Sequence, residues 1–145
     1  MTSRIVTIAD ALTSDLNGHS FSESLSAVRR LRPRFTEEDL ADLQVSVVPR
    51  RRSMTLDSRA PDLVRDYQID VAFHKRLSAE NDNTETDPLL DLCEEVQEYV
   101  AALEISGAWC VDTASPLDDD SLWADEMLRG GIFLWVFTAT FREIL

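Results

Sequence analysis

The sequence "IFLWVFTATFREI", residues 132–144, alternates between two sets of side chains. One set is apolar and mostly aromatic: Phe133, Trp135, Phe137, Ala139 and Phe141. The other set is Leu134, Val136, Thr138, Thr140 and Arg142. A repeat of two residues is typical of a β-strand. Because this strand is apolar on both faces, we expect it to be central in its sheet, or covered by a helix on one face and by another subunit on the other.

Two further strands are predicted upstream. Residues 67–75 alternate clearly, and residues 43–48 do so over a shorter length. The segment between them, residues 49–66, is too long for a tight turn and contains turn formers such as Pro61 and Asp62. We therefore expect an extended hairpin arm over residues 49–66 that carries both strands past the body of the domain. Long connections of this kind are usually functional, so the hairpin arm is a candidate contact element.

Helical spacing of apolar residues predicts two helices. The first spans residues 5–16 and ends at Asn17 and Gly18, and the second spans residues 87–104. Shorter strands are expected at residues 21–31 and 108–111, a short helical turn at 36–40, and an acidic helix or loop at 118–128. This order predicts a single α+β domain over residues 1–145, with a mostly antiparallel sheet, two main helices on one face and a long protruding β-hairpin.

Size and composition fit a globular chain. The 145 residues can bury a substantial core without a metal or a disulfide. No apolar run is long enough to cross a membrane, and Asp10 and Asp15 in the first residues argue against a signal peptide. We therefore expect synthesis in a reducing cytoplasm, where Cys93 and Cys110 serve as small apolar residues.

Charge is distributed unevenly along the chain, whose net charge is -13. Residues 1–76 contain 12 basic and 11 acidic groups, whereas residues 77–145 contain 2 basic and 16 acidic groups. Half of all basic residues lie within residues 29–52: Arg29, Arg30, Arg32, Arg34, Arg50, Arg51 and Arg52. Such asymmetry indicates a charged partner, either DNA or the acidic half of another copy.

No catalytic, cofactor or metal motif is recognisable, and we expect a protein that is not an enzyme. His19 and His74 are expected to be solvated polar residues. Three consecutive aspartates, residues 118–120, cannot converge on one cation in regular structure. Trp109 and Trp135 are expected in the core, whereas Trp123 lies in an acidic segment where a partner would have to cover it.

The candidate interface residues are those of the arginine cluster and its surroundings. Arginine suits interface ion pairs because its guanidinium group forms forked hydrogen bonds. A nucleic-acid site usually combines net positive charge with several aromatic side chains, and this segment has Phe35 alone. Contact with carboxylates of neighbouring subunits or of another protein is therefore preferred to contact with DNA phosphates, and solvated arginines without a partner are the other interpretation. The remaining candidates are Met54 and Leu56 in the hairpin arm, together with Trp123.

The chain resembles small neck or tail-completion proteins of tailed bacteriophages. The resemblance is carried by "RRLRPRFTEEDLADLQVSVVPR" (29–50), "RDYQIDVAFHKRL" (65–77), "DPLLDLCEEVQEYVAAL" (87–103) and "GIFLWVFTATFREIL" (131–145). It implies a tail terminator, which forms a ring, commonly of six copies, on the end of the tail tube. The implied partners are further copies of itself, the tail tube protein, the head-side connector, and genomic DNA that passes through the lumen without sequence-specific binding.

The implied location is the virion neck, after assembly in the host cytoplasm and without contact to a membrane. The resemblance carries no catalytic residue, and the contacts of the hairpin arm cannot be transferred from it. Three alternatives stay open: a head-closure or adaptor protein at another level of the neck, a DNA-binding module that uses residues 29–52, and a hydrolase favoured only by the acidic cluster.

Overall fold

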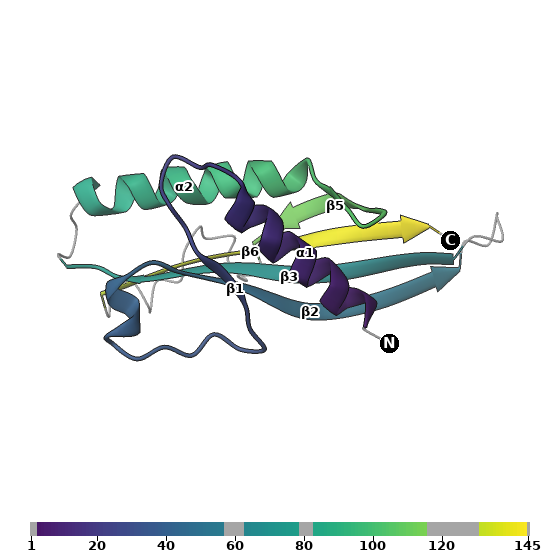
Figure 1. Ribbon diagram of the computed structural model, residues 1–145, viewed down its shortest axis with the longest axis horizontal. Helices are drawn as coiled ribbons and strands as arrows, with labels where there is room; N and C mark the ends of the chain where they lie inside the picture. The colour runs from purple at the N-terminus through teal and green to yellow at the C-terminus, as the bar shows by residue number, and fades with distance from the viewer. Residues whose placement is uncertain (1–2, 57–62, 79–82, 116–130, 145) are drawn as a thin grey trace.

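The computed structural model describes residues 3–56, 63–78, 83–115 and 131–144. They form two α-helices and one six-stranded sheet in the order β1-β2-β3-β6-β5-β4 (Figure 1). All neighbouring strands are antiparallel except β1 and β2. The predicted α+β fold is confirmed. The elements are α1 (Arg4–Gly18), β1 (Ala27–Arg29), the 3-10 helix η1 (Asp39–Ala41), β2 (Gln44–Leu56), β3 (Leu63–Arg76), α2 (Asn83–Ala101), β4 (Glu104–Ile105), β5 (Ala108–Ala114) and β6 (Ile132–Ile144).

Strand β6 lies between β3 and β5, as its two apolar faces predicted. Its aromatic face is buried, and no residue of that face from Phe133 to Phe141 is more than 4% exposed. In the antiparallel register with β3, Phe73 pairs with Trp135 and Val71 pairs with Phe137. Partners in such a register share a face, so this inner face of the sheet is apolar across both strands.

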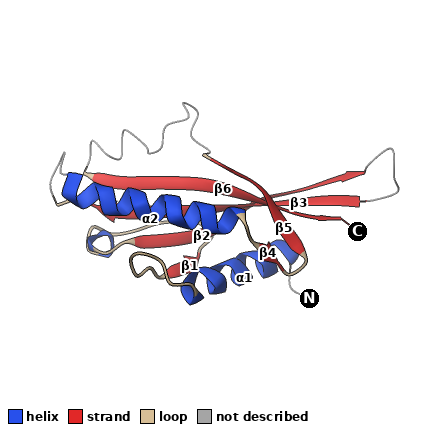
Figure 2. Ribbon diagram, turned by 90° about the horizontal axis from the view of Figure 1, so that it is seen from above, coloured by secondary structure: helices blue, strands red, loops and turns tan. Residues whose placement is uncertain are grey.

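Both helices cover the inner face. Helix α1 packs on β1 and β2, and α2 packs on β5 and β6, while the sheet curls until β4 also reaches α1 (Figure 2). Full burial of one leucine or isoleucine side chain of these helices contributes about 1.5–3 kcal/mol to folding. The buried helical residues are Ile8, Ala9, Leu12, Leu16, Leu89, Leu92, Cys93, Val96 and Val100.

Helix α2 begins at Asn83, four residues before the predicted start. The Glu85 carboxylate in its first turn accepts a hydrogen bond from the backbone N–H of Ser78 at 3.0 Å.

The predicted hairpin is present. Strands β2 and β3 stay paired from Gln44 with His74 to Leu56 with Leu63. The sequence did not indicate that β6 would follow β3 over this whole length, up to the pair Val64 and Ile144. The hairpin arm therefore has a third strand beside it, and the three strands extend beyond the helices (Figure 1).

The strand predicted at residues 21–31 is wrong for most of its length, because only Ala27–Arg29 pair with a neighbour. Side chains outside this segment bind its backbone, at Ala27, the first residue of β1, and at Ser22 ahead of it. The Asn17 amide binds the backbone N–H and C=O of Ala27 at 2.7 and 3.0 Å. The Glu95 carboxylate accepts the N–H of Ser22 at 3.1 Å. Because the N–H of Ser22 already has this partner, it does not need a sheet ladder.

Residues 30–43 cover part of the outer face, the face of the sheet opposite the helices. The guanidinium of Arg30 donates to Ser46 Oγ at 2.8 Å and lies 4.9 Å from the centre of the Phe35 ring. The Phe35 ring in turn lies 5.1 Å from the ring of His74. His74 is therefore half-buried rather than solvated, and its Nδ1 atom has no hydrogen-bond partner among the described residues.

This burial predicts an acid-sensitive fold. Desolvation, with the nearby Arg30 charge, lowers the pKa of His74 from 6.5 to about 4. The unfolded imidazole binds a proton below pH 6.5 and the folded one resists it, so stability should fall as the pH drops from 6.5 towards 4. We expect the wild type to lose about 1–2 kcal/mol more than His74→Gln over this window, measured by urea unfolding at several pH values. Equal losses in both proteins would contradict this account.

Candidate assembly interface

One long side of β2 is open. Strand β1 pairs with β2 only at Val45, Ser46 and Val47. Residues 49–56, the β2 part of the hairpin arm, have β3 on one side and no strand of the described chain on the other. We call this stretch the open β2 edge. Unpaired backbone N–H and C=O groups along such an edge are able to bind another strand.

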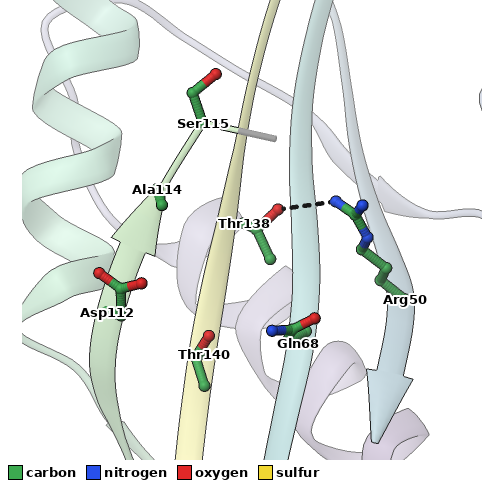
Figure 3. Close-up of a pocket in the computed structure, with 7 residues that line it drawn as sticks. All are labelled: Arg50, Gln68, Asp112, Ala114, Ser115, Thr138 and Thr140. Atoms are coloured by element: carbon green, nitrogen blue, oxygen red, sulfur yellow. Dashed lines mark hydrogen bonds between the residues drawn. The ribbon is translucent and has the colours of Figure 1, made fainter. Parts of the chain in front are cut away.

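A β-bulge at Arg50 turns two arginines to the same side of the sheet. Pro49 pairs with Ile69, whereas Arg51 pairs with Gln68, so Arg50 is the extra residue. Arg50 and Arg51 then both lie on the outer face, because a bulge interrupts the alternation of side chains. The Arg50 guanidinium donates to Thr138 Oγ1 at 3.2 Å (Figure 3). The Thr138 hydroxyl donates to Asp70 at 2.6 Å.

A second bulge lies in β5, between Cys110 and Asp112. Both bulges occur on one row of the sheet, since Arg51 pairs with Gln68, Gln68 with Thr140, and Thr140 with Asp112. Bulges increase the local twist, so the sheet is bent along this row. An open hollow of about 190 Å³ lies on the outer face here, between β2 and β5 (Figure 3). Its walls are formed by Arg50, Gln68, Asp112, Ala114, Ser115, Thr138 and Thr140.

The walls of this hollow offer a guanidinium, a carboxylate, an amide and hydroxyl groups. These groups bind polar side chains or backbone groups of a partner through hydrogen bonds. They do not include a histidine or a cysteine. No cluster of His, Cys, Asp and Glu within the described part of the chain could hold a metal ion.

The structure divides the predicted arginine cluster into three groups. Arg29 and Arg30 are held by their own chain, since Arg29 Nε lies 2.5 Å from Asp10 Oδ1 and Arg30 binds Ser46. Arg32 and Arg34 are exposed in the loop that follows β1. The remaining three lie together on the open β2 edge: Arg50, Arg51 and Arg52.

Arg52 faces the inner side of the hairpin arm, with its guanidinium 6.0 Å from the centre of the Tyr67 ring. Met54 and Leu56 follow on the same face and are 53% and 74% exposed. Trp123, the last candidate interface residue, lies outside the described residues, as does the expected acidic helix or loop at residues 118–128. The open β2 edge therefore combines positive charge with exposed apolar side chains.

The opposite side of the molecule is acidic. No lysine, arginine or histidine occurs between residues 77 and 128. Helix α2 and strand β5 lie along the upper side of Figure 1, and β2 lies along the lower side. Asp91, Glu94 and Glu98 are exposed on α2, and Asp112 is exposed on β5. Opposite charges therefore occupy the two lateral sides of the sheet.

Sequence reasoning missed two exposed apolar residues on the acidic side. Trp109 was expected in the core, but it is 40% exposed and pairs with Arg142 on the outer face. Val111, next to it in the β5 bulge, is 39% exposed. The only available signal was that "AWCVDT", residues 108–113, has charge and polarity at one end, which is atypical of a fully buried strand.

A buried carboxylate ties the hairpin arm to α1. Glu143 in β6 is 7% exposed, accepts a hydrogen bond from the Tyr67 hydroxyl at 2.7 Å, and pairs with Arg4 of α1 at 2.9 Å. Arg65 Nη1 lies 3.7 Å from the same carboxylate. Burial opposes ionisation, but the bonds from Tyr67 and Arg4 and the charges of Arg4 and Arg65 hold the pKa of Glu143 below its usual value. Glu143 is therefore an anion that joins three elements.

We expect Glu143→Gln to lower the free energy of unfolding by about 2–3 kcal/mol, because two arginines lose their anion at a buried site. The matched control is Asp66→Asn, which removes the more exposed pair of Asp66 with Arg142 on the outer face and should cost less than about 1 kcal/mol. Both values are measured by urea unfolding at neutral pH. Equal losses would show that Glu143 is no more important than a surface pair.

Comparison with known proteins does not identify the chain. No protein-family model matches it, and no curated protein matches it. Neither α1 nor α2 is long and apolar enough to span a membrane.

Proposed function

We propose that this protein is a structural subunit that assembles side to side with further copies of itself. The observation that carries the proposal is the separation of charge onto opposite lateral sides: Arg51 and Arg52 on the open β2 edge, and exposed carboxylates of α2 and β5 on the other side. Contacts between two different surfaces of identical subunits form a ring when the rotation closes.

Complementary charge explains how copies with a net charge of -13 associate. Repulsion between distant charges is screened beyond about 8 Å at physiological salt. Close opposite charges across an interface are screened less and also orient the partners. Short-range attraction between the two sides therefore exceeds the diffuse repulsion between whole molecules.

Together with the resemblance to neck proteins, this arrangement supports a tail terminator of a tailed bacteriophage. In this role the chain forms a ring, with six copies proposed, that caps the tail tube and joins it to the head-side connector, while DNA passes through the lumen. The excess of carboxylates keeps such a lumen anionic and prevents adhesion of DNA. The proposal assigns the chain no catalytic role and places it in the virion neck.

A DNA-binding module is supported less well. Arg29, Arg30 and Arg50 are engaged by Asp10, Ser46 and the pair of Asp70 with Thr138. Residues that already have partners in their own chain contribute less to phosphate binding, which depends on the number of phosphates that are neutralised. A head-closure protein would use the same side-to-side contact, and only its level in the neck would distinguish it from a tail terminator.

The test is co-expression with the tail tube and connector proteins of the same genome, followed by native mass spectrometry and electron microscopy. We expect rings at the end of the tube that faces the head. Rings at the connector instead would favour the head-closure protein. A chain that stays monomeric with both partners would overturn the proposal.

Charge reversal on the open β2 edge should break the ring. Arg51→Glu places a carboxylate where the neighbouring copy is acidic, so we expect the dissociation constant between subunits to rise about tenfold or more, which corresponds to about 1.4 kcal/mol. Arg76→Glu is the matched control. Arg76 is exposed at the end of β3 that lies away from the hairpin arm, and its substitution changes the net charge by the same amount. Light scattering over a dilution series measures both variants, and an equal effect of both would count against the arginine edge.

A further inference from the structure

The sheet has a second open edge, on the acidic side. Strand β4 pairs with β5 only at Ala108 and Trp109. The backbone N–H of Cys110 donates to the C=O of Leu103 at 3.0 Å, so this residue also has a partner on that side. Residues 111–114 have β6 on one side and no strand of the described chain on the other. We call this stretch the open β5 edge. The molecule therefore carries one open edge on each lateral side, residues 49–56 on β2 and residues 111–114 on β5.

The two open edges run in opposite directions. Strand β2 is antiparallel to β3 and therefore runs the same way as β6, whereas β5 is antiparallel to β6. Rotation about an axis along the strands keeps these directions, so the β2 of one copy would meet the β5 of the next in antiparallel orientation. A closed ring has no rise per subunit, so the two edges that meet must lie at the same height along the strands. Both open edges include the row of Arg51, Gln68, Thr140 and Asp112, and they therefore meet this condition.

The side chains on each open edge favour pairing with the other open edge over pairing with a copy of the same edge. Pro49, the bulge at Arg50 and three consecutive arginines are features that prevent indiscriminate strand pairing. Two open β2 edges would place arginines against arginines, and this pairing is disfavoured. The open β5 edge carries Asp112 and the exposed Val111, and no basic residue. Opposite charges on facing strands stabilise their pairing.

We propose that the open β2 edge of one copy pairs, antiparallel, with the open β5 edge of the next copy, so that the sheets of all subunits join around the ring. This inference rests on the proposed ring and adds the way in which its subunits bind. The inner faces of both sheets lie on the same side in this arrangement. Arg51 and Asp112 then share the outer face, while Met54 and Thr113 share the inner face. Strand β4 and the bond from Cys110 to Leu103 limit the contact on β5 to residues 111–114.

A cysteine scan of the hairpin arm tests this pairing against Thr113→Cys, an inner-face position of the open β5 edge, in a Cys110→Ser background. Arg52, Met54 and Leu56 have inner-face side chains, whereas Ser53 and Thr55 have outer-face side chains. Facing residues on antiparallel strands have Cα atoms about 4.5–5.5 Å apart, which suits a disulfide only when both side chains share a face. Cys93 will not compete, because it is 1% exposed and burial raises the pKa of its thiol.

Each hairpin-arm variant, in the Thr113→Cys and Cys110→Ser background, is co-expressed with the tube protein, oxidised mildly and analysed on non-reducing gels. We expect a ladder of covalent oligomers for at least one of Arg52→Cys, Met54→Cys and Leu56→Cys, and none for Ser53→Cys or Thr55→Cys. Restoring Thr113 in each arm variant should abolish the ladder. These residues lie on the exposed edge of the arm, so substitution leaves the core intact.

The outcomes separate this inference from the proposed function. Rings without cross-links, or with cross-links from both faces equally, would overturn the strand pairing and leave the ring in place. The absence of rings in the unmodified protein would overturn the ring and the pairing with it. Cross-links confined to alternate residues would support both.

Discussion

The pairing of β3 with β6 supports everything else in this molecule. The ladder runs without interruption from Val64 and Ile144 to Arg76 and Ile132. Its inner face places the side chains of Tyr67, Val71 and Phe73 against those of β6, and the two helices pack on the resulting apolar surface. A shift of the register by one residue would turn the aromatic residues of β6 to the outer face. The same ladder extends past the helices and gives the hairpin arm its third strand.

A three-stranded arm differs physically from a free hairpin. An isolated pair of strands is marginally stable in water, whereas a third strand and a packed face give independent stability. Tyr67 and Glu143 supply that packed face, and Arg4 connects it to α1. The open β2 edge is therefore held in an extended conformation before any partner arrives. Binding then costs less conformational entropy than it would for a loose loop.

The parts of the fold that the sequence predicted are those in which local pattern and burial agree. Alternation over residues 132–144 predicted a strand, because alternation is a local pattern, and its two apolar faces allowed the central position that the structure shows. Residues 21–31 alternate as well, yet the Glu95 side chain binds the N–H of Ser22 in place of a neighbouring strand, and no local pattern reveals such a long-range partner. His74 was misjudged for the same reason, since its cover comes from Phe35.

The candidate interface was predictable only in outline. The run of Arg50, Arg51 and Arg52 was visible in the sequence, but an ordinary strand would place these side chains on alternate faces. The bulge that brings Arg50 and Arg51 to one face depends on the register against Gln68, which the sequence does not contain. The exposure of Trp109 likewise depends on the outer face of β5 being uncovered there.

An open strand edge is a liability, and this sheet has two. Proteins usually protect such edges with charge, proline or bulges, and β2 has all three at residues 49–52. Protection that repels every strand would need no acidic counterpart, yet every charged residue from 77 to 128 is acidic. With arginine on one edge and aspartate on the other, like edges repel and unlike edges attract. The charge asymmetry along the chain is then a means of choosing which edges pair, and it favours closed assembly of identical copies over aggregation.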